Sequence, residues 1–258
     1  SDTERTSFDA AVTGSTGIDG FDDWARELVL TGYLHNHARM WFASIWIFTL
    51  RLPWQLGADF FMRHLLDGYP ASNTLSWRWV AGLQTVGKTY LATAHNIESS
   101  TGGRFRPRGL ATHAFAIEDD APMPVPLAAP QPGSLPRGRI ALLLHEDDLH
   151  AEAFAQSLRA GGAQVVAVAA PRAGEPRSTL SPMSSLVGAF TGGALANGLE
   201  RAREHFGVEA SVLEGLRASE VLPWLQTHDV TALVTPYPPV GPVRHRLDQL
   251  GSDLASEV

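Results

Sequence analysis

The sequence predicts a multidomain protein with an all-α domain over residues 1–117 and a Rossmann-like α/β domain with a parallel sheet over residues 139–258. Before residue 118, apolar residues recur at spacings of three and four, which is typical of amphipathic helices. After residue 138, short apolar runs alternate with amphipathic stretches, which is typical of a parallel α/β layout. Between them, six of the 17 prolines lie within residues 118–138, and we interpret this segment as an extended linker.

The individual elements follow from the same periodicities. In the first domain we expect helices at residues 21–30, 34–50, 54–66 and 74–84, separated by short Gly, Pro and Asp breaks. In the second we expect strands at 140–144, 165–169, 210–213 and 231–235, and helices near 149–160, 185–206, 217–227 and 242–256. Glycines at positions 161, 162 and 207 stand where two of these helices should end.

Composition and charge exclude several classes of protein. The chain has no cysteine, which removes disulfides, thiolate metal sites and cysteine nucleophiles. The longest uncharged apolar stretch, residues 40–50, is far shorter than the ~20 residues of a membrane span, so we expect a cytoplasmic protein without a membrane partner. Residues 1–117 hold ten basic and ten acidic side chains. This neutral balance argues against generic nucleic-acid binding, which needs a basic excess.

Aromatic residues are concentrated in the first domain, where six of the seven tryptophans lie between positions 24 and 79. A tryptophan-rich helical core explains this as readily as a planar cofactor bound among the helices. Asn36, Arg39 and Met40 share one face of an apolar helix at spacings of three and four. An arginine in such a segment either extends to solvent or forms a buried pair with an acidic residue, for which Asp67 is the nearest candidate.

Two segments carry a resemblance to a known family. The run TGYLHNHARMWFAS, followed by LPWQLGADFFMRHLLDGYPASNTLSWRWVAGLQT, resembles the FAD-binding helical domain of the DNA photolyase and cryptochrome family, and the similarity extends over residues 14–100. The resemblance implies FAD as the cofactor. It matches Arg39 and Asp67 to the ion pair beside the isoalloxazine ring, and Asn73 to the residue that faces flavin N5. Asn36 and Tyr69 also fall on cofactor-side positions, Tyr69 where the family usually has an aspartate.

The resemblance also assigns catalytic positions. Trp77 and Trp54 match the first two members of the tryptophan chain that passes electrons to the photoexcited flavin. The third member would fall at Ser1, so the relay is either incomplete or completed by another tryptophan, for which the candidates are Trp24, Trp41 and Trp46.

The lesion side of the implied site is formed by Trp79, Met40 and Asn36. Trp79 matches the aromatic residue that packs against a flipped-out pyrimidine dimer. His37 stands where the family usually has an arginine that contacts DNA phosphate, which weakens the expectation of DNA binding. Met40 replaces the second histidine of (6-4) photolyases and disfavours that lesion class.

The function implied is light-driven electron transfer from FAD that repairs cyclobutane pyrimidine dimers in DNA, the lyase activity of a deoxyribodipyrimidine photolyase. The alternatives are a cryptochrome-like blue-light photoreceptor or flavin redox sensor without repair, and a remnant that binds no cofactor. The family helices that hold the flavin phosphates precede the matched region, so we expect this chain alone to retain FAD poorly, or to work beside a companion segment that supplies them. No metal is expected.

The second domain carries no nucleotide fingerprint, because no GxGxxG motif follows the strand at residue 140. The sequence HEDD at residues 145–148 is interpreted as the capped start of a helix in preference to a metal cluster. The segment TPYPPVGP from residue 235 follows a strand, where open α/β sheets bind ligands, although it is equally consistent with a rigid loop. The order of elements faintly resembles the family's antenna domain; the identity of any antenna chromophore stays unknown.

Overall fold

The computed structural model describes residues 2–118, 135–177 and 182–256. The chain divides into two compact units, the first formed by Ser1–Met123 with Arg177–Val187 and the second by Pro124–Pro176 with Gly188–Val258. A short segment from the middle of the α/β region therefore belongs to the helical unit. Most of the predicted linker, residues 119–134, lies outside the described residues. No helix of the described residues combines the length and the apolar character that a bilayer crossing needs.

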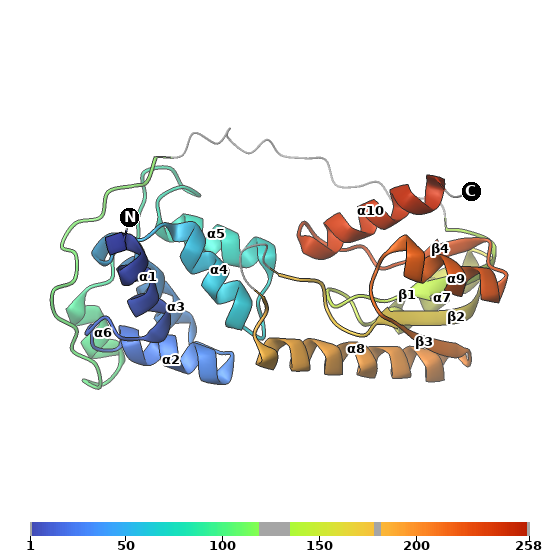
Figure 1. Ribbon diagram of the computed structural model, residues 1–258, viewed down its shortest axis with the longest axis horizontal. Helices are drawn as coiled ribbons and strands as arrows, with labels where there is room; N and C mark the ends of the chain where they lie inside the picture. Colours follow the sequence, from blue (N-terminus) through green and yellow to red (C-terminus); the bar gives the residue numbers. More distant parts are fainter. Residues whose placement is uncertain (1, 119–134, 178–181, 257–258) are drawn as a thin grey trace. The chain divides into compact units, whose positions relative to one another are not determined.

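The first unit is helical, as the sequence predicts (Figure 1). Its helices are α1 (Asp2–Thr13), α2 (Phe21–Thr31), α3 (Asn36–Ser44), the π-helix η1 (Ile45–Thr49), α4 (Trp54–His64), α5 (Pro70–Val80) and α6 (Ala94–Ser100). They enclose one aromatic core, in which Phe21 stacks on Phe42 with ring centroids 4.3 Å apart. Trp46 and Phe42 are entirely buried in this core. Because large aromatic side chains bury much apolar area, these contacts account for much of the stability of the unit.

The predicted helix over residues 34–50 is confirmed from Asn36 to Thr49, but its second half is not an α-helix. The α-helix gives way at Ile45 to one turn of π-helix, in which the Leu50 amide donates to the Ile45 carbonyl at 2.9 Å. Pro53 prevents the helix from continuing, since proline restricts the residue before it to extended geometry. Two further helices, α1 and α6, were not anticipated, and α5 begins four residues earlier than the predicted helix because Pro70 occupies its first turn.

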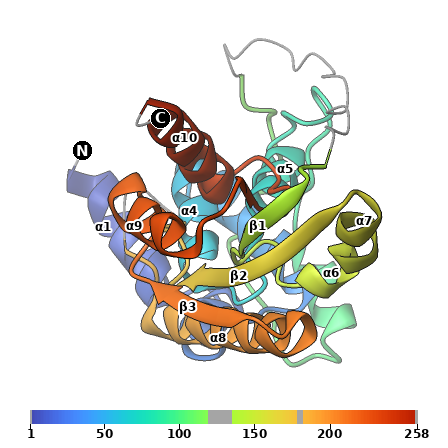
Figure 2. The same cartoon turned by 90° about the vertical axis from the view of Figure 1, so that its right-hand side faces the viewer.

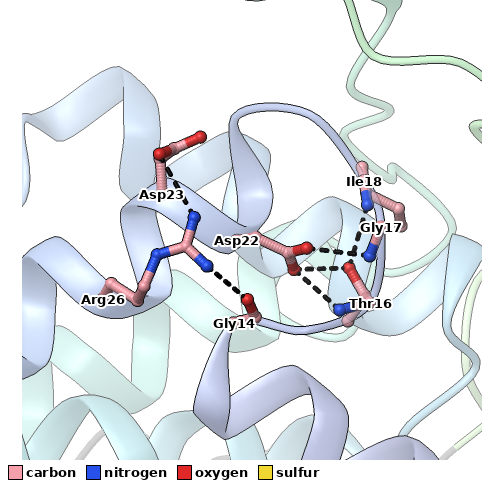
Figure 3. Close-up of polar contacts among 7 residues, drawn as sticks. All are labelled: Gly14, Thr16, Gly17, Ile18, Asp22, Asp23 and Arg26. Atoms are coloured by element: carbon pink, nitrogen blue, oxygen red, sulfur yellow. Dashed lines mark hydrogen bonds and ion pairs between the residues drawn. The ribbon is translucent and has the colours of Figure 1, made fainter.

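The loop between α1 and α2 is held by one carboxylate (Figure 3). Asp22, in the first turn of α2, accepts hydrogen bonds from the Thr16 amide at 2.9 Å, the Thr16 hydroxyl at 2.6 Å and the Gly17 amide at 2.8 Å. On the next turn, Arg26 donates to the Gly14 carbonyl at 2.6 Å. All of these bonds are internal to the loop and α2, so this polar cluster has a structural role and is not a candidate ligand site.

The second unit is a doubly wound α/β sheet with strand order β3-β2-β1-β4, all parallel. The four predicted strands are confirmed as β1 (Gly138–Leu143), β2 (Ala163–Pro171), β3 (Glu209–Leu213) and β4 (Ala232–Val234). Alternate residues of β1 enter two separate cores. Ile140 and Leu142 pack with α7 (Ala155–Ala160) and α8 (Ser185–Phe206), while Ala141 and Leu143 pack with α9 (Ala218–His228) and α10 (Pro242–Ser256). Figure 2 shows these helix pairs on opposite faces of the sheet.

The helices α7 and α8 end at glycines, as the sequence predicts. Gly162 and Gly207 adopt φ values of +83° and +64° just after α7 and α8, which is the left-handed geometry that glycine favours at helix ends. The predicted helix start at residues 145–148 is wrong. His145 and Asp148 instead form an isolated bridge in a tight turn, and the 3-10 turn η2 (Ala151–Phe154) precedes α7.

Candidate functional site

The first unit contains a cavity of about 290 Å³ whose walls come from α3, α4, α5 and the turn before α5. This volume lies at the small end of the range for ligand pockets. Most of the residues that the resemblance singled out meet here. The lining residues are Asn36, Arg39, Met40, Ala43, Phe61, Leu65, Asp67, Gly68, Tyr69, Ser72, Asn73, Ser76, Trp77, Trp79 and Val80.

Arg39 and Asp67 form an ion pair at this cavity. The Arg39 Nη2 donates to both carboxylate oxygens of Asp67, at 2.9 and 3.1 Å, and its Nε donates to the Leu34 carbonyl at 2.8 Å. The Tyr33 ring lies under the guanidinium, 5.6 Å from ring centroid to Cζ. The expectation of a buried pair is wrong, since 25% of the Arg39 side chain and 58% of the Asp67 side chain are exposed. Such a pair contributes at most ~1 kcal/mol to folding, so its main effect is to fix geometry.

Asn73 presents a fixed amide to the cavity. It is buried on α5, and its Nδ2 donates to the Ala58 carbonyl of α4 at 2.8 Å. This bond replaces part of the hydration that the amide loses on burial. One Nδ2 hydrogen is used in this bond, so Asn73 can bind a molecule through Oδ1 as an acceptor or through the second Nδ2 hydrogen as a donor.

Trp77 forms the inner wall and depends on a glycine in the facing helix. A Cβ on Gly57 would lie 2.2 and 2.5 Å from Trp77 ring carbons and 3.0 Å from a Trp46 ring carbon. The Trp77 ring also meets Phe61 and Trp46 edge to face, with centroids 5.1 and 6.1 Å apart. Its Nε1 is buried without a hydrogen-bond partner among the described residues.

Trp79 stands at the open side of the cavity, 37% exposed. Its ring stacks on Tyr90 with centroids 5.5 Å apart and planes 25° apart. Tyr90 was not anticipated from the sequence. The stacking fixes one face of the Trp79 indole against protein, so any partner of Trp79 must contact the other face or the ring edge.

Ser72 and Ser76 also line the cavity and were not anticipated. Together with Tyr69, Asn73 and Trp77 they follow spacings of three and four along α5. Helical periodicity applied to polar residues would have found them, because residues at spacings of three and four share one face of a helix.

His37 and Trp54 do not line this cavity. His37 lies in a second groove with Trp24 and Trp41, where its ring stacks on Trp41 with centroids 5.7 Å apart. Trp54 is half-buried at the start of α4, with the Arg78 guanidinium 5.7 Å from its ring centroid. The structure therefore separates these two side chains from the other residues implied by the resemblance.

Titratable groups near the cavity are few. Burial lowers the pKa of His64, at the end of α4, to about 4, and the charge of the neighbouring Arg63 acts in the same direction. Among the described residues, no three His, Asp or Glu side chains converge as metal ligands would. The polar groups of the cavity are thus an ion pair, amides and hydroxyls, which suit binding by hydrogen bonds more than proton transfer.

Comparison with known families finds that residues 1–107 match the family model described as the FAD binding domain of DNA photolyase. The deoxyribodipyrimidine photo-lyase of Streptomyces griseus is 44% identical over 73 residues, which are 28% of this chain and 16% of that protein. The enzyme of the same name from Thermus thermophilus is 36% identical over 111 residues, which are 43% of this chain and 26% of that protein. The match confirms the resemblance over residues 1–107 and supports FAD as the cofactor of this region.

The matched relatives are much longer than the segment they share with this chain. In Vibrio cholerae, a deoxyribodipyrimidine photo-lyase is 35% identical over 96 residues, 37% of this chain and 20% of that protein. This chain therefore spans about a fifth of the curated relatives. No solved structure matches the chain. The similarity of the α/β unit to an antenna domain stays a prediction.

Proposed function

We propose that this chain, whose residues 1–107 match the FAD binding domain of DNA photolyase, holds the isoalloxazine of FAD in the α3–α4–α5 cavity and acts in light-driven repair of cyclobutane pyrimidine dimers. One observation carries the proposal. A single cavity collects the Arg39–Asp67 pair, Asn73, Trp77 and Trp79, although these residues lie on different helices and up to 40 positions apart in sequence.

The polar atoms of the cavity suit a flavin ring. The described residues give Arg39 Nη1 no partner, so it is a donor for a ring carbonyl, while Asn73 Oδ1 is an acceptor for a ring N–H. Trp77, Phe61 and Val80 supply apolar walls. An uncharged side chain at Asn73 adds no second negative charge beside an anionic reduced ring.

The cavity volume also bears on affinity. A space of about 290 Å³ suits one ring system, whereas a complete dinucleotide buries most of its surface only in a larger pocket. The isoalloxazine is therefore held by these walls while the remainder of FAD receives fewer contacts from them. We expect a complex that is specific but weak.

When bound and reduced, FAD supplies the photoexcited electron that splits the dimer. The chain's own residues position the partners. Trp79, which stacks on Tyr90, offers a partly exposed indole to a base taken out of the duplex, and Met40 and Asn36 line the same cavity. Trp77, in the wall, is the group from which a bound flavin can recover an electron.

The experiment is single-turnover photorepair. The chain is loaded with FAD, reduced with dithionite, mixed with an oligonucleotide that contains one thymine dimer, and illuminated. We expect the absorbance change that accompanies splitting of the dimer only in the light and only with reduced FAD. Trp79→Ala should form much less repaired product than the wild type. Flavin binding without repair would contradict the repair function while leaving the cofactor site intact.

A flavin photoreceptor without repair is the second candidate, and one observation favours it. His37 stands in the position from which the family reaches DNA phosphate, yet it stacks on Trp41 in a separate groove. Light-driven flavin reduction in the presence of a soluble thiol, without any repair of dimer-containing DNA, would establish this alternative.

A further inference from the structure

Four residues of the turn at residues 65–69 line the cavity. They are Leu65, Asp67, Gly68 and Tyr69. Two backbone hydrogen bonds shape the turn. The Leu66 amide donates to the Gly32 carbonyl at 2.9 Å, and the Gly68 amide donates to the Leu65 carbonyl at 3.1 Å. Because more than half of the Asp67 side chain is exposed, packing does not hold it, and its position depends on the backbone of this turn.

A third contact to the turn comes from a residue far along the chain. Arg177 Nη1 donates to the Leu65 carbonyl at 2.8 Å, across 112 positions of sequence. The Leu65 carbonyl follows the last residue of α4, where the helix leaves acceptors without intrahelical donors and carries partial negative charge. The guanidinium is a second donor to this carbonyl, beside the Gly68 amide, and complements the helix dipole.

Gly68 makes room for this guanidinium. A Cβ on Gly68 would lie 2.9 Å from Arg177 Nη1 and 3.0 Å from the Leu65 carbonyl oxygen. Arg177 thus packs against the backbone between Asp67 and Tyr69, both of which line the cavity. Any rotation of this peptide that displaced Asp67 would have to break the contact.

Two more hydrogen bonds hold the same segment to the end of α4. Arg63 donates from Nε to the Pro182 carbonyl at 3.0 Å, and the Arg63 carbonyl accepts from the Ser184 amide at 3.1 Å. The Ser184 hydroxyl in turn accepts from the Val187 amide at 3.3 Å at the start of α8. These bonds explain why Arg177–Val187 groups with the helical unit.

We propose that Arg177 is a positioning residue for the cavity: it fixes the turn at residues 65–69 and thereby holds the Asp67 carboxylate against Arg39. The consequence for FAD rests on the proposed function, whereas the positioning of the turn does not. Arg177 acts through Asp67, so its loss should weaken FAD binding only where Asp67 is able to pair with Arg39.

The first test needs no cofactor. Hydrogen exchange of the Leu66 and Gly68 amides is compared between the wild type, Arg177→Ala, Arg177→Lys and the control Arg172→Ala, which removes an exposed arginine paired with Glu214 in the α/β unit. We expect about tenfold faster exchange at Gly68 in Arg177→Ala, as the loss of a hydrogen bond from a charged donor implies. Partial protection should return in Arg177→Lys, and the control should match the wild type. Unchanged Gly68 exchange in Arg177→Ala overturns the proposal.

The second test is a double-mutant cycle on FAD affinity with Arg177→Ala and Asp67→Asn. Arg177→Ala alone should weaken binding about tenfold, and it should have little further effect in the Asp67→Asn background. Additive effects would overturn the route through Asp67. If the wild type binds no FAD, the proposed function fails, while the exchange measurement still decides whether Arg177 positions the turn.

Discussion

Substitution of Gly57 sets a gain in helix propensity against a steric clash with Trp77. Gly57→Ala in the middle of α4 should favour the helix by ~1 kcal/mol, because alanine loses less backbone entropy than glycine. The added Cβ would, however, meet two Trp77 ring carbons at 2.2 and 2.5 Å. Real Cβ contacts do not approach so closely, so Trp77 or α4 must move.

The clash should win. Trp77 is almost fully buried and is held by Phe61 and Trp46, so it cannot leave its site without disturbing the core. Overpacking of this kind costs ~1–3 kcal/mol and occasionally more. After the helix gain is subtracted, we expect a net destabilisation of up to ~2 kcal/mol, together with a displaced indole in the cavity wall.

The assay is chemical denaturation followed by tryptophan fluorescence, with Gly193→Ala as the matched control. Gly193 lies inside α8, and a Cβ there would meet nothing within 4 Å. The control should stabilise the protein by ~0.5–1 kcal/mol. If Gly57→Ala is as stable as the control and leaves the emission of the folded state unchanged, the packing of Trp77 on α4 is wrong.

Further predictions concern photoreduction, the Asp22 loop and pH. Trp77→Phe should slow flavin photoreduction at least tenfold in the FAD-loaded chain without changing its dark absorbance, and an unchanged rate by transient absorption would refute the relay role. Asp22→Ala should cost ~1.5–3 kcal/mol of unfolding free energy, because three donors lose a charged acceptor, whereas Asp23→Ala, which removes one exposed pair, should cost under ~1 kcal/mol. Because the pKa of His64 is lowered to about 4, the unfolded state binds more protons between pH 6.5 and 4, so acidification should destabilise the helical unit and His64→Gln should flatten that slope. Burial raises the pKa of Glu146 to about 7, so the folded state binds more protons than the unfolded state between pH 4.5 and 7. The α/β unit should therefore lose stability as the pH rises from 4.5 to 7. Glu146→Gln should remove this loss, as measured by thermal melts over a pH series.

The α/β unit shows how far periodicity carries a prediction. Ile140, Ala141, Leu142 and Leu143 read as one apolar run, which indicates a strand buried on both faces, and the structure confirms it with two cores. The helical unit was predicted less completely. Nothing in the apolar pattern of residues 40–50 distinguishes an α-helix from the π-turn at Ile45, since this stretch has no charged residue to mark a change in which face is exposed.

The site was predictable to the extent that it depends on residues close together on two or three helices. The Arg39–Asp67 contact followed from the need of an apolar helix face to satisfy a guanidinium, but its exposure did not, because burial at a turn is set by what packs over it. The contact between Arg177 and Leu65 lay beyond sequence reasoning altogether. The two residues are 112 positions apart, and the acceptor is a backbone carbonyl. Any residue type at position 65 would offer the same acceptor, so neither residue type nor spacing indicates the contact.

A titration of this chain with FAD, followed by flavin fluorescence, tests the cavity as a flavin site in the wild type, Asp67→Asn and the control Asp229→Asn. Asp229 is fully exposed and only loosely paired in the α/β unit, at 4.0 Å from Arg139. We expect saturable binding at one FAD per chain, weakened about tenfold or more by Asp67→Asn and unchanged by Asp229→Asn. Absence of saturable binding, or equal affinity in all three proteins, would contradict the assignment of the α3–α4–α5 cavity to the flavin.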